Sequence, residues 1–360
     1  MDNVKIFASY IDENAKEQIR NLARVPAFQG SKIRIMPDCH TGKGCVIGFT
    51  ADLGDKVIPD VVGVDIGCGM LLTKINDSIL DLKKLDETIR ACVPSGRRVR
   101  QKAIESFDLS VLKHSFRDKD IDHFERSIGT LGGGNHFIEV DYGKDGSYYL
   151  LIHTGSRNLG TQIADFYQKE AIAMQSLNGT ATVPESLCYL EGKARENYLN
   201  DMRIAQEFAK ENRRRIRDII FSHMDWKEGE SVECVHNYIG DDNIIRKGAI
   251  SARQGEKLII PLNMRDGVIL GRGKGNEEWN YSAPHGAGRA LSRMEARGHL
   301  SLDEFSQEMQ GIYTTCINVG TLDEAPMAYK NPKDILTYLP QTATIEDILK
   351  PIYNFKAAEF

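Results

Sequence analysis

The chain has 360 residues, of which 41% are hydrophobic and 27% are charged, values typical of a soluble globular protein. Its formal net charge of −5 argues against a nonspecific coat of nucleic acid, although it leaves room for a local basic groove. Because no apolar run approaches the roughly 20 residues of a membrane span and the N-terminus is too polar for a signal peptide, we expect a cytoplasmic protein without a membrane segment.

The first half of the chain alternates short strands with helical stretches. Residues 1–30 predict a short strand, an amphipathic helix over residues 11–23 and a loop. Residues 32–70 are short β-branched segments broken by glycines, which predict compact strands and tight turns. Residues 78–126 are charged and helical in pattern, and they include the basic cluster SGRRVRQK (95–102), which we interpret as solvated surface.

The second half is organised around one long predicted helix. Strand signals return at residues 127–142 and 148–167, and residues 191–224 predict the helix from the spacing of Tyr198, Met202, Ala205, Ala209, Ile216 and Ile220. Its RRRIR segment (213–217) is expected to complement the helix C-terminus. Residues 230–295 predict short strands and Gly turns, and residues 301–360 predict helical and loop segments. Without a repeat or linker, we expect a single α+β domain over residues 1–360, with mixed β-sheets surrounded by helices.

An acid and a thiol stand three residues apart in VVGVDIGCGM (61–70), after an apolar run that resembles the end of a buried strand. Glycines around Asp65 and Cys68 let the backbone bend so that both side chains can face one point, which is half of a plausible metal site. Taken alone, Cys68 is more typical of an inert buried thiol than of a metal ligand. The seven cysteines are scattered without CxxC pairs, so we expect reduced thiols instead of disulfides or a structural zinc site.

Nine histidines fall into two groups. Four lie in charged helical surroundings and are assigned ordinary surface or packing roles: His114, His123, His223 and His299. Five lie beside glycines or at predicted strand ends: His40, His136, His153, His236 and His285. Any one of these five alone is more typical of a packed or loop histidine, but together with Asp65 and Cys68 they favour a metal centre.

The number of candidate ligands exceeds what one ion needs. A carboxylate, a thiolate and three imidazoles suit two adjacent ions that share a bridging thiolate, and this mixed set is compatible with manganese, zinc or cobalt.

The segment HGAGRALSR favours phosphate binding. Small residues after His285 leave backbone N–H groups exposed, and Arg289 and Arg293, four residues apart, are expected to share a helical face. Arg157 stands at the same distance after His153. The alternative is a helix N-terminus with surface arginines. We favour phosphoryl or nucleotidyl transfer beside metal ions, with a histidine as nucleophile.

Seven blocks of this chain resemble, in the same order, the signature motifs of the RtcB-type RNA-splicing ligases: MPDCHTGKG, VGVDIGCGM, LGGGNHFIEV, HTGSRNLG, HNY, SAPHGAGRALSR and DEAPMAYK. The resemblance extends from about residue 30 to about residue 330 and implies an RtcB-like fold. That family joins an RNA 3′-phosphate or 2′,3′-cyclic phosphate end to a 5′-hydroxyl end, using GTP and manganese, in RNA repair or tRNA splicing.

The resemblance also implies roles for individual residues. It assigns two Mn²⁺ to Asp65, Cys68, His136, His153 and His236, with Cys68 bridging. It makes His285 the nucleophile that attacks the α-phosphate of GTP and carries GMP as a guanylyl-histidine, and it makes Asp38 the acid that orients the His285 ring, a role close to that of the acid in a hydrolase triad.

The nucleotide contacts implied by the resemblance are Asn135, Phe137, Glu139, His285, Gly286, Ala287, Gly288, Tyr329 and Lys356. Glu139 and Lys356 would favour guanine, because guanine offers N–H donors and an O6 acceptor. The phosphate contacts are Arg157, Arg289 and Arg293.

This sequence departs from the family pattern at several places. It has LNMR at residues 262–265 where a Gly-Ser-Met-Gly turn is usual, Ala283 and Pro284 before His285, and no Lys-Gly pair at the C-terminus, which bears on Lys356. The chain is also shorter than typical members. We therefore expect a divergent, shorter branch of the family.

The leading hypothesis is a GTP- and Mn²⁺-dependent RNA ligase whose partners are RNA ends. The alternative is a dinuclear metal-dependent phosphoesterase that acts on RNA ends without GTP. A third is a non-catalytic RNA-end binder whose metal site serves folding, which the presence of both Asp38 and His285 disfavours.

Overall fold

The computed structural model describes residues 3–77, 79–177 and 183–357, and most of its strands form two sheets. The five-stranded sheet has the order β1 (Val4–Ile6), β2 (Ile33–His40), β3 (Ile47–Asp52), β11 (Ile244–Lys247), β10 (Asn237–Ile239). The seven-stranded sheet has the order β13 (Lys257–Asn263), β14 (Gly267–Gly273), β16 (Ala343–Lys356), β6 (Phe137–Tyr142), β7 (Tyr148–Thr154), β5 (Gly69–Ile75), β9 (Glu228–Val235). Two short pairs join β4 (Lys56–Val57) to β8 (Leu190–Glu191) and β12 (Ala249–Ser251) to β15 (Ser282–Pro284).

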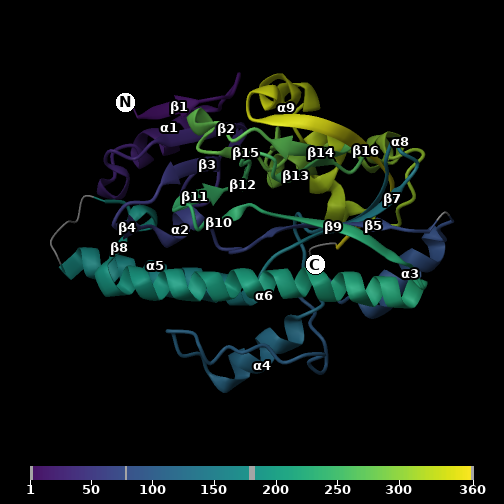
Figure 1. The fold of residues 1–360 in the computed structure, drawn as a ribbon, viewed down its shortest axis with the longest axis horizontal. Coiled ribbons are helices and arrows are strands. Elements are labelled where there is room, and N and C mark those ends of the chain that lie inside the picture. Colours follow the sequence, from purple (N-terminus) through teal and green to yellow (C-terminus); the bar gives the residue numbers. More distant parts are fainter. Residues whose placement is uncertain (1–2, 78, 178–182, 358–360) are drawn as a thin grey trace.

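Helices lie on both sides of the sheets (Figure 1). They are α1 (Glu13–Leu22), α2 (Pro59–Val62), α3 (Leu82–Cys92), α4 (Asp118–Ser127), α5 (Arg157–Leu177), α6 (Gly192–Met224), α7 (Arg293–His299), α8 (Leu302–Glu308) and α9 (Pro332–Tyr338). In Figure 1, α5 and α6 run along the lower side of both sheets, and α4 lies below them. The α+β fold class is therefore confirmed, with β1 parallel to β2 in an otherwise antiparallel five-stranded sheet. That the chain forms one domain stays a prediction.

Helix α6 is the element that the sequence predicted best. It spans 33 residues, and all six apolar residues named from its periodicity are fully buried: Tyr198, Met202, Ala205, Ala209, Ile216 and Ile220. One part of its buried surface packs with α5 under the five-stranded sheet, and the C-terminal part packs with α3 under the seven-stranded sheet. Because one helix packs under both sheets, it holds the two sheets in place relative to each other. The N-terminal strand and helix were also predicted correctly, as β1 and α1.

Three local predictions were wrong. Residues 343–356 form the long strand β16 instead of a helix or loop; its ladder partners β14 and β6 are distant in sequence, and Pro351 interrupts any alternation that would have marked it. Residues 157–167, expected to continue a strand, begin α5. The apolar run before Asp65 is the short helix α2, which Pro59 opens at its first position, and not the end of a strand.

Within the described part of the chain, every helix is too short or too polar to cross a membrane.

Candidate active site

The five candidate metal ligands lie where four neighbouring strands of the seven-stranded sheet begin or end. Strands β6, β7, β5 and β9 are antiparallel neighbours, so the starts of β5 and β6 lie beside the ends of β7 and β9. Asp65 and Cys68 precede β5, His136 precedes β6, His153 is the penultimate residue of β7, and His236 follows β9. Alternating strand direction therefore brings together residues that are far apart in sequence, such as Asp65 and His236, which are 171 positions apart.

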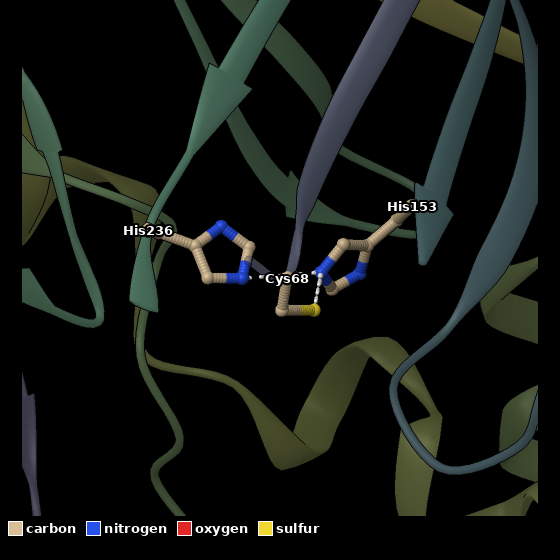
Figure 2. Close-up of side chains that lie close together, drawn as sticks. All are labelled: Cys68, His153 and His236. Carbon is tan, nitrogen blue, oxygen red and sulfur yellow. Dashed lines mark hydrogen bonds between the residues drawn. The ribbon is translucent and has the colours of Figure 1, made fainter. Parts of the chain in front are cut away.

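The side chains of these residues, which we call the ligand cluster, are in mutual contact. The Cys68 Sγ atom lies 3.3 Å from His153 Nε2 and 3.5 Å from His136 Nε2. His153 Nε2 is 3.3 Å from His236 Nε2, and Asp65 Oδ2 is 2.9 Å from His136 Nε2. Figure 2 shows Cys68 between His153 and His236, which point toward each other from the end of β7 and from the residue that follows β9.

The hydrogen-bond partners of two rings determine which of their nitrogens carries a proton. His136 Nδ1 lies 2.9 Å from the carbonyl oxygen of Leu131, and His153 Nδ1 lies 3.0 Å from that of Asn135. Since a carbonyl oxygen only accepts, each Nδ1 carries the hydrogen, and in a neutral ring Nε2 is left with a lone pair. Both Nε2 lone pairs face Cys68 Sγ, which has at most one proton to offer. Burial also lowers the pKa of His153, which keeps that ring neutral.

This arrangement fits a metal site by the chemistry of its donors. Asp65 with Cys68 and His136, and Cys68 with His153 and His236, form two triads whose ligand atoms lie within 4.8 Å of one another. The shared Cys68 suits a thiolate between two ions. The carbonyl partners of the Nδ1 atoms are the outer contacts that usually orient histidine ligands. Asp65 Oδ1 has no hydrogen-bond partner among the described residues, which leaves it available as a donor atom.

A glycine allows Asp65 to reach this position. A Cβ atom on Gly155 would lie only 2.1 Å from Asp65 Oδ1, so any larger residue after β7 would displace the carboxylate.

Two polar residues of α6 hold the loops that carry the ligands. Asn212 accepts from the backbone N–H of Gly129 at 2.8 Å and donates to the carbonyl oxygen of Gly155 at 3.2 Å. The fully buried Arg213 donates to the carbonyl oxygens of Gly67 and Thr154 at 2.9 and 2.8 Å. The expected role of RRRIR at the helix C-terminus is therefore wrong for Arg213, which connects the start of β5 to the end of β7 from the middle of the helix.

His285 and Asp38 meet between β15 and β2. The buried Asp38 Oδ2 accepts from His285 Nδ1 at 2.6 Å and from the His285 backbone N–H at 3.1 Å. A carboxylate on Nδ1 leaves Nε2 as the ring nitrogen with a free lone pair. The His285 ring centroid is 4.9 Å from that of His236, so the ring borders the ligand cluster. Gly288 permits this close fit, because a Cβ there would lie 2.3 Å from the Asp38 carbonyl oxygen.

The ligand cluster and His285 open into one cavity of about 320 Å³. All the residues expected to contact a nucleotide line it: Asn135, Phe137, Glu139, His285, Gly286, Ala287, Gly288, Tyr329 and Lys356. The ladder between β16 and β6 places Lys356 opposite Phe137, with the ammonium 5.3 Å from the ring centroid. Glu139 accepts from Asn354 at 2.5 Å, and burial raises the pKa of its carboxyl group.

The wall of the cavity contains a buried charge network centred on Glu324. Its carboxylate accepts from Lys356 Nζ at 2.5 Å and from the Tyr329 hydroxyl at 2.5 Å. The guanidinium groups of Arg293 and Arg289 lie 2.8 and 3.2 Å from the same carboxylate. Burial alone would raise the pKa of Glu324, but Lys356, Arg293 and Arg289 outweigh it and lower the pKa to about 2. We call these five residues the Glu324 network.

The three arginines expected to bind phosphate are placed differently from one another. Arg289 and Arg293 line the cavity, but they do not share a helical face: Arg289 is bridged to Tyr329, and α7 begins only at Arg293. Arg157 is outside the described lining of the cavity and donates to Gly96 and Thr130.

Sequence reasoning missed Glu324, Arg213 and Asn212 as residues of the site. Glu324 is the second of two acids in DEAPMAYK, after Asp323, and both could have been considered as partners of the expected cations. Arg213 and Asn212 gave no signal, because polar residues in a charged helix are typical of its exposed face. The structure also places His40 in the cavity lining, with Nδ1 2.9 Å from the Asp38 carbonyl oxygen.

The chain is similar to known proteins over nearly its whole length. A family model described as "tRNA-splicing ligase RtcB" matches residues 18–117 and 111–357. The RNA-splicing ligase RtcB of Escherichia coli K12 is 31% identical over 392 residues, covering 96% of this chain and 93% of the relative. The tRNA-splicing ligase RtcB of Methanococcus maripaludis is 28% identical, covering 90% and 87%. That of Archaeoglobus fulgidus is 27% identical, covering 91% and 87%.

Proposed function

This chain belongs to the RtcB family of RNA ligases, and from that premise we propose that it joins RNA 3′-phosphate or 2′,3′-cyclic phosphate ends to 5′-hydroxyl ends with GTP and Mn²⁺. The observation that carries the proposal is the pair of Asp38 and His285 beside the ligand cluster, in one cavity that Glu139 and Lys356 also line. A histidine held in this way has its outer nitrogen free for attack, and the cavity supplies groups for a purine.

His285 is the proposed nucleophile. Its Nε2 lone pair attacks the α-phosphorus of GTP, an N–P bond forms, and the bond to pyrophosphate breaks, which leaves a guanylyl-histidine. The ring gains positive charge in this step. Asp38, fully buried and 2.6 Å from Nδ1, stabilises that charge and fixes the ring orientation.

Transfer of the guanylyl group to RNA is the proposed second stage. An oxygen of the RNA 3′-phosphate attacks the guanylyl phosphorus, and the N–P bond breaks to restore neutral His285. The 5′-hydroxyl oxygen then attacks the activated RNA phosphorus and gives up its proton to solvent; the phosphodiester bond forms as the bond to GMP breaks, and GMP leaves. Arg289 and Arg293 line the cavity and are proposed to contact the phosphates directly. Arg157 is outside the described lining of the cavity and donates to Gly96, so it is proposed to attract the phosphates from behind the loops that carry the metal ligands.

The ligand cluster is proposed to hold two Mn²⁺ ions, with Cys68 between them. When bound, such ions neutralise phosphate charge and bring the reacting groups together. The chain's own contribution is to hold five donor atoms at one sheet edge and to orient two imidazoles through the carbonyl oxygens of Leu131 and Asn135.

Guanine selection is proposed to depend on Glu139 and Lys356, with Asn135, Phe137 and Tyr329 completing the contacts. Glu139 is held by Asn354, and Lys356 is held by Glu324, so both groups are fixed before a nucleotide arrives.

Incubation with labelled GTP and MnCl₂ tests the proposal. We expect acid-labile, alkali-stable label on the wild-type chain and none on His285→Ala. Absence of label from the wild type, or undiminished label on His285→Ala, would contradict it. The phosphoesterase alternative predicts turnover of RNA ends without GTP. A ligation assay with 3′-phosphate, cyclic phosphate and 3′-hydroxyl ends then defines which end is used.

A further inference from the structure

A second hollow lies on the helical side of the molecule and shares no lining residue with the catalytic cavity. It has a volume of about 860 Å³ and lies between the end of α3, the segment that follows it and the end of α6. Its lining includes Cys92, His223 and part of the basic cluster at residues 95–102 that the sequence suggested was plain solvated surface.

Cys92 differs from the other cysteines in its exposure. Among the seven cysteines, all of them described and all free thiols, six are buried and Cys92 alone is partly exposed. It is the last residue of α3, and its side chain faces the hollow. Reagents in solution therefore reach this thiol before the others.

His223 is positioned to accept the proton of this thiol. Cys92 Sγ lies 3.4 Å from His223 Nε2, and His223 Nδ1 lies 2.8 Å from the carbonyl oxygen of Ile219. The carbonyl oxygen fixes the hydrogen on Nδ1, so the Nε2 lone pair faces the thiol.

Three cations of the hollow have no carboxylate partner within the described residues. Arg100 donates to the carbonyl oxygens of Cys92, Ile128 and Gly129, at 2.9, 3.1 and 2.7 Å. Arg98 contacts only Ser95, at 3.4 Å, and no hydrogen bond or ion pair involves the exposed Lys102.

The other two arginines that line the hollow are paired with carboxylates, most of which lie outside its lining. Arg90 pairs with Asp86, and Arg215 pairs with Glu105, Glu211 and Asp218. An uncompensated positive charge therefore surrounds Cys92.

We propose that Cys92 is a reactive thiol in an anion-binding hollow and that it undergoes exchange with small disulfides that carry carboxylates. His223 takes the thiol proton, and the Cys92 sulfur attacks one sulfur of the disulfide. A new S–S bond forms as the old one breaks, and the departing thiolate receives the proton from His223. Arg98, Arg100 and Lys102 hold the carboxylates of the incoming molecule. This inference is independent of the proposed ligation chemistry.

Exchange with two disulfides tests the proposal on the full chain under native conditions. The charged probe is glutathione disulfide and the neutral probe is hydroxyethyl disulfide, with adducts followed by intact mass and located by peptide mapping. We expect one adduct per chain, at Cys92, and none on Cys92→Ser. His223→Gln should slow exchange with both probes, because glutamine cannot take up the proton.

Charge variants separate the hollow from the thiol. Removing both Arg98 and Lys102 as alanine variants should slow the charged probe roughly two- to thirtyfold, the combined effect of two weak solvent-exposed ion pairs, and should leave the neutral probe unchanged. Arg97→Ala is the matched control, because Arg97 is exposed beside the hollow but does not line it. An adduct on a buried cysteine or an unchanged rate in His223→Gln would overturn the proposal. So would an equal effect of the Arg98 and Lys102 variants on the charged and the neutral probe.

Discussion

The ligand cluster and the Glu324 network border the same cavity and satisfy their polar atoms in opposite ways. In the ligand cluster, the Nε2 atoms of His136 and His153 converge on Cys68, and among the described residues no cation hydrogen-bonds to these atoms. In the Glu324 network, three cations and a phenol already share one carboxylate. The first region is therefore the one proposed to take up an external cation, whereas the side chains of the second already hold one another in place.

Removing the atom that the two triads share gives the largest expected effect. Cys68→Ala should reduce guanylylation by at least about 100-fold, since loss of an outer ligand contact alone typically costs 10- to 100-fold. The labelled-GTP assay measures this, with circular dichroism as the check on folding. Cys45→Ala is the matched control, because Cys45 is also fully buried but lies outside the cluster. Uptake of GMP by Cys68→Ala at the wild-type rate would show that guanylylation does not depend on the ligand cluster.

Neutralising the carboxylate behind the nucleophile is the next largest change. Asp38→Asn keeps the shape of the side chain but loses the charge that stabilises the His285 ring, so guanylylation should fall by about 10²- to 10⁴-fold. Mn²⁺ affinity should stay near the wild-type value, because Asp38 is outside the ligand cluster. Equal losses of Mn²⁺ binding and guanylylation would show instead that Asp38 acts through the fold.

Breaking the support beneath the ligand cluster should have a smaller effect on activity and a measurable effect on stability. Arg213→Met leaves the carbonyl oxygens of Gly67 and Thr154 without their donor and should weaken Mn²⁺ binding about 10- to 100-fold. It should also lower the free energy of unfolding by about 3–5 kcal/mol. The exposed neighbour Arg214→Met is the control, measured by calorimetry and denaturant unfolding. If both variants behave alike, Arg213 does not hold the loops.

The smallest effect on activity is expected from a change in the Glu324 network. Glu324→Gln keeps the side-chain shape, so Lys356 and Tyr329 should lose only part of their positioning, and the KM for GTP should rise about tenfold with a smaller change in kcat. A larger loss in kcat than in KM would place Glu324 in the chemistry instead of in nucleotide binding.

The pH dependence of stability gives the same variant a second readout. Because the pKa of Glu324 is lowered from 4.5 to about 2 in the folded chain, the unfolded state binds more protons between these values. Its contribution, on the order of 3 kcal/mol, is therefore fully present above about pH 5 and is lost as the pH falls toward 2. Glu324→Gln should flatten this acid limb of the unfolding curve, whereas the exposed Glu17→Gln should not.

The two regions also differ in how far the sequence could predict them. The ligand residues stand in glycine-rich strand ends, so Asp65, Cys68 and their histidines could be named, although only the antiparallel order of four strands brings them together. Glu324 and Lys356 are joined by the placement of β16 in the sheet, a long-range pairing without a local pattern. Arg213 resembled a surface residue, because the charge of a helix segment does not reveal which arginine points inward.

Binding of Mn²⁺ to the nucleotide-free chain tests the central claim most directly, because the claim is that the ligand cluster lacks a cation that the Glu324 network already has. Equilibrium binding should give two ions per chain, with tight binding lost in Cys68→Ala and retained in Glu324→Gln. No binding to the wild type, or undiminished binding to Cys68→Ala, would contradict it.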